Sequence, residues 1–278
     1  MFLSAFILDN YGDDSFFILN ILGESFFIKL PGYLIVFEIA AISFIFSGYF
    51  LSLTKDRSES SEETFSFSLP FLNMKQKLNE IFSNRFLPIL ITFNIIVGLV
   101  QVMGNSYYGI FIYQNYKNSY FGGFLNIAIV FLIGVFSSLI GYYITKINTR
   151  SYGPTSMLVI GGFFLSSMPL AYYIGGSLAL LTAGTILGVI GASAIGISIN
   201  MFVIEIMHEQ DRRYYYIFNG LFSIIPYIIL VPIFSYVAQK YSLNILFLVL
   251  SATLIISTIA VMLLHKLLAK ELSNISVF

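Results

Sequence analysis

Hydrophobic residues run along this chain in long blocks that are separated by short polar stretches. A membrane-spanning helix needs about 20 mainly apolar residues, because the hydrocarbon core is about 30 Å thick and a helix rises 1.5 Å per residue. No block of this length contains an interior lysine or arginine, which would cost about 3 kcal/mol at the membrane centre. The pattern predicts seven spans, at residues 33–54, 87–113, 120–145, 155–175, 178–204, 214–238 and 243–265.

Two stretches do not fit the spanning pattern. Residues 55–86 open with KDRSESSEETFSFS, a polar run of low complexity that is typical of a linker. The second part, 71–86, repeats apolar residues at helical spacing, which predicts a short amphipathic helix on the membrane surface, either a plain connector or a regulatory segment. Residues 1–32 are short and interrupted by acids, and we expect an interfacial helix or the remnant of an earlier span.

Composition narrows the class of protein. Of 278 residues, 58% are hydrophobic and 10% are charged, whereas soluble domains carry about 25% charged residues. Lipid is therefore the expected solvent, and zero net charge implies no bulk attraction to nucleic acid. Cysteine is absent, and we find no catalytic triad, phosphate-binding loop or metal-spaced cluster. We expect neither an enzyme nor a cofactor or metal.

Positive charge is unevenly divided between two sets of alternating loops. One set holds only Lys29, Lys117 and Lys240, and the other holds the remaining eleven of the 14 lysines and arginines. Because cytoplasmic loops are enriched in positive charge, the richer set is predicted to be cytoplasmic. We expect a multi-pass plasma-membrane protein with its N-terminus outside, its C-terminus inside and a cytoplasmic turn at 146–154.

A polar stripe runs along the predicted span 87–113. Its six residues recur at steps of four and three, which places them on one helix face. Three are amides, which would be unsatisfied against lipid, so the face should meet another helix or a water-filled cavity. Hydrogen bonds between helices are one interpretation, and we favour the other, a cavity for a solute. The stripe consists of Asn94, Gly98, Gln101, Asn105, Tyr108 and Ile112.

Two later spans carry further signals. In 178–204, small residues recur every four positions and permit close helix approach; they are Gly184, Gly188, Ala192 and Gly196. Asn200 continues this spacing and is expected to face either the cavity or a neighbouring helix. In 214–238, Pro226 and Pro232 each remove a backbone hydrogen bond and can kink the helix.

Ionisable residues are scarce inside the predicted spans. Glu38 is the only acid well within a predicted span, about 8 Å from its start. We expect an interfacial or cavity-edge group or, alternatively, an ion-coupling residue. Glu205 and Arg212 flank the turn after 178–204. They are either a latch between helices or two solvated charges of little energetic value.

The segment GYYITKINTR (141–150) resembles the cytoplasmic loop signature of the major facilitator superfamily, roughly G-x-x-x-D-[RK]-x-G-[RK]-[RK]. Three residues match the signature, and three others replace its acid, its glycine and one basic residue. The matching residues are Gly141, Lys146 and Arg150, and the replacements are Thr145, Asn148 and Thr149.

Two more segments are similar to the sugar-porter branch of that family. QVMGN (101–105) is similar to the Q-Q-x-x-G-x-N run of the seventh span, with Asn105 one residue early. EIMHEQDR (205–212) is similar to the E-I-x-P-x-x-x-R end of the tenth span, with His208 in place of proline. The chain has no tryptophan, although a sugar-stacking tryptophan often occupies the position of Asn200.

The resemblance implies an all-α membrane protein of about seven transmembrane helices. Residues 33–54 would be a helix like the sixth span, 87–270 the C-terminal six-helix bundle, and 271–278 a cytoplasmic tail. In such transporters two bundles rock about a central site. The resemblance implies that Gln101 and Asn105 touch the solute, and that the cytoplasmic gate consists of Lys146, Arg150, Glu205 and Arg212.

Taken with the stripe, the resemblance predicts half of a secondary transporter, in the manner of an ion-coupled symporter. Its solute would be a small neutral organic molecule, sugar-like or another metabolite, bound by Asn94, Gln101, Asn105, Tyr108 and Asn200. Its partners would be the bilayer, the solute, and a missing N-terminal half or a second copy. The alternative is a non-transporting membrane subunit, a sensor or an inactive gene remnant.

Overall fold

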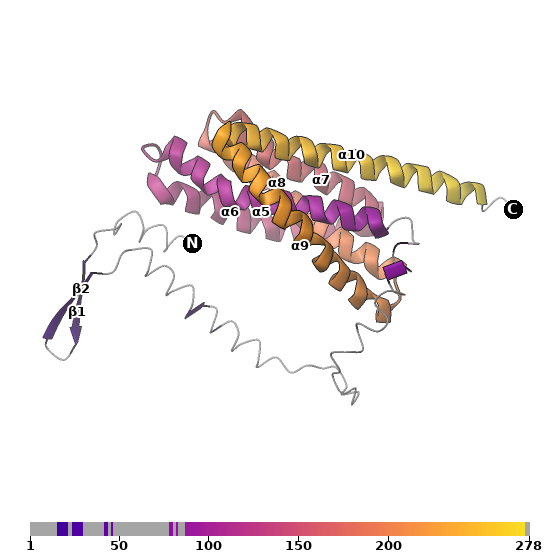
Figure 1. The fold of residues 1–278 in the computed structure, drawn as a ribbon, viewed down its shortest axis with the longest axis horizontal. Coiled ribbons are helices and arrows are strands. Elements are labelled where there is room, and N and C mark those ends of the chain that lie inside the picture. Colours follow the sequence, from indigo (N-terminus) through magenta and orange to yellow (C-terminus); the bar gives the residue numbers. More distant parts are fainter. Residues whose placement is uncertain are drawn as a thin grey trace. The chain divides into compact units, whose positions relative to one another are not determined.

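The computed structural model describes residues 16–21, 24–29, 42–43, 46, 78–79, 82 and 87–275. They fall into two compact units, each described here by itself. Unit 1 comprises residues 1–67 and 115–129, and unit 2 comprises 68–114 and 130–278. The long helices, shown in Figure 1, are α5 (Leu87–Tyr116), α6 (Gly123–Tyr152), α7 (Pro154–Ile174), α8 (Leu178–Ile206), α9 (Glu209–Lys240) and α10 (Leu243–Ile275).

These six helices are long and apolar enough to cross a membrane, which confirms six of the predicted spans. The helices α6 and α10 continue well past the predicted ends at 145 and 265. The other predicted span, 33–54, which includes Glu38, and the linker 55–86 lie outside the described residues except at six helical positions. These are Ile42, Ser43, Phe46, Leu78, Asn79 and Phe82.

Within residues 1–32, the described part is a β-hairpin and not the expected helix. Strand β1 (Phe16–Ile21) pairs antiparallel with β2 (Glu24–Lys29), so that Ile21 faces Glu24 across the turn. The two strands, FFILNI and ESFFIK, are rich in phenylalanine and isoleucine, which favour the pleated strand. The expectation of an interfacial helix over these residues is therefore wrong.

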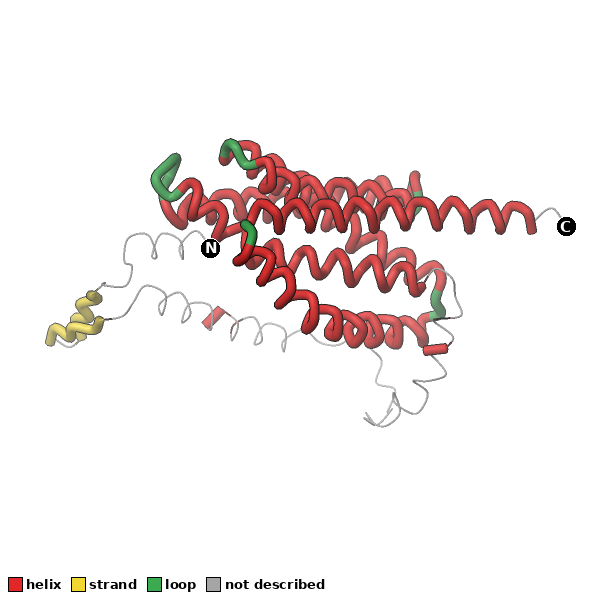
Figure 2. The backbone as a smooth tube through the Cα atoms, turned by 45° about the horizontal axis from the view of Figure 1, so that its top comes forward, coloured by secondary structure: helices red, strands yellow, loops and turns green. Residues whose placement is uncertain are grey.

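The links between successive helices of unit 2 are very short (Figure 2). Between α6 and α7 only Gly153 is not helical, with φ of 77°, a conformation that glycine adopts without strain. The predicted cytoplasmic turn 146–154 is thus mostly helix. Polar residues such as lysine, serine and threonine occur both in turns and at the ends of helices. Their presence at 146–154 therefore did not distinguish a turn from the end of α6.

The closest packing in unit 2 joins α7 to α8 through small residues. A Cβ on Gly191 would lie 2.5 Å from the carbonyl oxygen of Gly161, and Gly184 lies against Ala171. The predicted four-residue stripe is only partly used, because no described residue lies within 4 Å of a Cβ built on Gly196. A helix turns about 100° per residue, so a strict four-residue repeat drifts about 40° per step, and the contact leaves the stripe after Gly188.

The helix α7 also packs against α10 and α5. Ser251 of α10 donates a hydrogen bond of 3.2 Å to the carbonyl oxygen of Ser166. The ring centroids of Tyr172 on α7 and Phe247 on α10 lie 5.5 Å apart. Both rings also contact the ring of Tyr108 on α5. Three helices are therefore joined by an aromatic cluster, in which Tyr172 and Phe247 are fully buried.

Two helices leave most of their apolar surface uncovered. In the most apolar stretch of α9 only 6% of the residues are buried, whereas in that of α7 56% are buried. In Figure 1, α9 crosses the other helices of unit 2 obliquely. In α6 28% of the most apolar stretch is buried, and its exposed apolar residues, like those of α9, require lipid or another protein to cover them. The exposed residues of α6 include Val135, Phe136, Leu139, Ile140, Tyr143 and Ile147.

Candidate functional site

The predicted stripe of α5 meets α9 at Gly98. The hydroxyl of Tyr227 lies where a Cβ of residue 98 would be. Gly98 therefore leaves room for the end of the Tyr227 side chain, which reaches α5 from α9. Asn94 and Gln101, one turn away on either side of Gly98, are half-buried.

The far end of the stripe is packed into the protein. Tyr108 is 3% exposed and Ile112 is fully buried. The ring of Tyr108 lies 4.3 Å from that of Tyr172 between centroids, and it covers Gly104, which leaves room for it. The structure thus places Tyr108 in the aromatic cluster, apart from the accessible amides.

The amides of the stripe have no hydrogen-bond partners in the described part of the chain. Among the described residues, no hydrogen bond reaches the side chain of Asn94, Gln101 or Asn105. Asn105 is exposed, and the other two are partly so. An amide inside a membrane span needs a hydrogen-bonding partner, so these groups need water, a solute or another chain beside them.

Asn200 does bond to a neighbouring helix. The hydroxyl of Tyr216 on α9 donates a hydrogen bond of 2.8 Å to its side-chain oxygen. Of the two alternatives for this residue, the structure therefore shows the bond between helices. Asn200 is itself exposed, so it also marks the edge of the contact between α8 and α9.

A second set of polar residues, on α9, was missed from the sequence. Tyr215, Asn219, Ser223 and Tyr227 are each four residues apart, so they follow one side of the helix and drift about 40° around it per step. Within the described part of the chain, the side-chain oxygens of Tyr215 and Asn219 are buried without a hydrogen-bond partner. The recurrence of polar residues every four positions is the sequence signal that could have identified them. Only the two prolines of this span were interpreted from the sequence.

Three of the four predicted gate residues have described side chains, and the cluster that would join all four stays a prediction. Arg212 donates from Nε to the carbonyl oxygen of Met207 (3.2 Å) and from Nη2 to that of Ile204 (3.0 Å). It therefore neutralises the carbonyl end of α8. Lys146 and Glu205 are exposed, and the side chain of Arg150 lies outside the described part.

The segment that resembles the facilitator loop signature is also helical. Thr145 and Thr149, in place of an acid and a basic residue, are buried and donate to the carbonyl oxygens four residues earlier. Gly141 lies against the backbone of α8, where a Cβ would be 2.9 Å from the Cα of Ile190. This part of α6 therefore serves helix packing.

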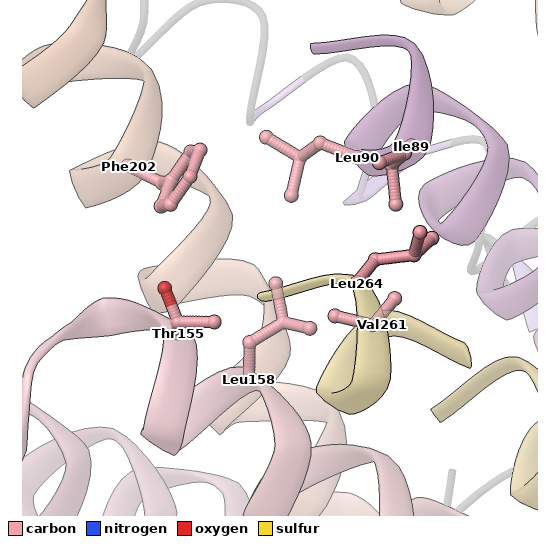
Figure 3. A pocket seen from close by; sticks show the side chains of 7 residues that line it. All are labelled: Ile89, Leu90, Thr155, Leu158, Phe202, Val261 and Leu264. Atoms are coloured by element: carbon pink, nitrogen blue, oxygen red, sulfur yellow. The ribbon is translucent and has the colours of Figure 1, made fainter. Parts of the chain in front are cut away.

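Two apolar cavities lie elsewhere among the described residues of unit 2. One of about 20 Å³ lies where α5, α7, α8 and α10 meet, and Thr155 is the polar residue among its seven lining side chains (Figure 3). A groove of about 260 Å³ adjoins it between α5 and α10. The hydroxyls of Thr92 and Ser257 in this groove donate to their own helices, so neither cavity suits a hydrogen-bonding solute.

Within the described residues, no group of three or more histidines or acids could hold a metal ion. Comparison with protein-family models, with curated proteins and with solved structures finds no match to this chain.

Proposed function

We propose that this chain is a membrane transport subunit that passes a small neutral solute by alternating access. The observation that carries the proposal is the set of accessible amides within the membrane-length helix α5, which have no partner among the described residues. Amides both donate and accept hydrogen bonds, which suits hydroxyl, carbonyl or amide groups of a solute. Sugar-like molecules and other neutral metabolites belong to this class.

The uncovered surfaces of α6 and α9 support a two-bundle assembly. Alternating access needs a second bundle that moves against the first. A missing N-terminal half of a facilitator-type transporter, or a second copy of this chain, would cover these surfaces. The prolines of α9, Pro226 and Pro232, interrupt its hydrogen bonding and favour bending during such motion.

Uptake measurements test this proposal through Gln101. We expect cells that express the assembled transporter to accumulate at least one solute from a radiolabelled panel of neutral sugars, polyols and amides. Gln101→Ala should weaken apparent affinity for that solute about 5- to 150-fold, because loss of one contact leaves a partner unpaired at about 1–3 kcal/mol.

The control is Val102→Ala, since Val102 is the next residue of α5 and is 43% exposed. It should leave affinity unchanged. Equal affinities of the two variants, or no uptake of any panel member, would contradict the proposal.

A non-transporting membrane subunit is the second candidate. The position of Arg212, which is bonded to the end of α8, favours it, because a gate needs charges that are free to part and rejoin. Purification decides between them: a transporter should bind its solute as an assembled complex, whereas a subunit should co-purify with a partner and bind none.

A further inference from the structure

One face of α9 is polar and the opposite face is apolar. The polar residues Tyr215, Asn219, Ser223 and Tyr227 lie on the side that contacts the bundle, since Tyr215 is fully buried and Tyr227 reaches α5. Polar inward and apolar outward is the pattern of a helix between lipid and a polar interior. The exposed outward residues are Ile217, Leu221, Ile224, Ile225, Ile228, Ile229 and Ile233.

One polar side chain of α9 reaches the stripe of α5. The hydroxyl of Tyr227 contacts α5 at Gly98. Asn94 and Gln101 flank this contact on α5, and Ser223 precedes it by one turn on α9. Two helices thus contribute hydrogen-bonding groups to a shared region, which we call the polar seam.

The groups of the polar seam satisfy one another only in part, because Tyr227 and Ser223 share a side-chain hydrogen bond within α9. If they only joined the helices, their donors and acceptors would bond across the contact. Instead the side-chain oxygens of Asn219 and Tyr215 are buried without a hydrogen-bond partner among the residues that the structure describes. Ser223 donates to the carbonyl oxygen of Asn219 on its own helix (2.6 Å). Groups that the protein leaves unsatisfied in this way are normally met by water or a ligand.

We propose that α5 and α9 enclose a water-accessible site for a neutral solute bearing hydroxyl or amide groups, contacted by Asn219, Ser223 and Tyr227. Asparagine, serine and tyrosine all both donate and accept hydrogen bonds. They carry no charge near neutral pH, so a charged solute would lack a counter-charge. The claim that a solute binds here rests on the proposed function, whereas the claim that water reaches the polar seam does not.

Cysteine labelling tests this inference cleanly, because the chain has no cysteine of its own. Ser223→Cys is placed in the full chain in membrane vesicles and treated with a small charged methanethiosulfonate. Only a thiolate in contact with water reacts. We expect Ser223→Cys to react about tenfold or more faster than either control.

The controls are Ser137→Cys and Ile225→Cys. Ser137 is 5% exposed and donates to the carbonyl oxygen of Ile133, and Ile225 is 61% exposed on the outward face of α9. If Ser223→Cys does not assemble in the membrane, Asn219→Cys replaces it. Reaction at the rate of the controls would mean a dry contact between helices and would overturn the inference.

A further substitution tests whether α5 forms the second wall. In the Ser223→Cys background, Gly98→Ala displaces the Tyr227 side chain and should raise the labelling rate severalfold. Gly220→Ala, with open space around position 220, should not. An unchanged rate with Gly98→Ala would exclude α5 from the site. If Ser223→Cys is labelled rapidly but Gln101→Ala binds the solute with normal affinity, the transport proposal is contradicted and the water-accessible site is not.

Discussion

At the scale of single residues, the same side chain can serve packing in one helix and chemistry in another. Thr145 and Thr149 are buried with hydroxyls bonded to their own helix, so they need nothing from outside. Asn219 is also turned inward, yet its side-chain oxygen has no partner in the described part of the chain. Residue type alone therefore does not identify a site; unsatisfied hydrogen-bonding capacity does.

Arg212 should contribute to stability through the end of α8. Its guanidinium donates to two carbonyl oxygens there. Arg212→Ala should lower the free energy of unfolding by about 1–2 kcal/mol, since the substitution removes charge-assisted hydrogen bonds from a helix terminus. Reversible unfolding of the purified chain in detergent measures it, with the exposed Lys146→Ala as control. Equal stability of the two variants would contradict this role.

At the scale of helices, close approach depends on where glycine lies around the axis. Gly191 faces the backbone of α7, whereas Gly196, five residues later, faces open space. Five residues turn a helix by about 500°, so Gly196 lies about 140° around the axis from Gly191. Small residues therefore act in packing only while they stay on the contact side.

The substitutions Gly191→Ala and Gly196→Ala should have opposite effects. A Cβ at 191 meets backbone atoms of α7 that cannot easily move, so we expect a loss of about 1–3 kcal/mol in the free energy of unfolding. At 196 the methyl group is free, and alanine should stabilise the helix by about 0.5–1 kcal/mol. Unfolding experiments on both variants check this, and changes of the same sign would refute it.

The sequence predicted helices better than it predicted their ends and contacts. Apolar length identified the spans of α5 to α10, because lipid leaves the backbone few alternatives. The link at Gly153 escaped prediction, since polar residues before it suit a helix end as well as a turn. The stripe of α5 was visible as a pattern, but only the fold shows that Gly98 meets Tyr227 and that Tyr108 belongs to the aromatic cluster.

At the scale of the whole molecule, orientation in the membrane remains a prediction from charge. Of the two sets of alternating loops, one holds eleven of the 14 lysines and arginines. Residues 55–86 and the C-terminal tail should therefore be cytoplasmic. Cysteines introduced at Ser60 and Ser276 should resist an impermeant thiol reagent in intact cells and react after lysis. Labelling of both in intact cells would reverse the orientation.

The single residue between α6 and α7 has a consequence for how the protein is made. One residue spans at most about 3.6 Å, so the end of α6 and the start of α7 cannot separate. During synthesis α6 therefore cannot diffuse into lipid while α7 is still being delivered by the ribosome. The two must leave the insertion machinery together, as a helical hairpin. Lengthening the link at Gly153 with a flexible polar segment would uncouple their insertion, and release of α6 alone would then become detectable in translation intermediates.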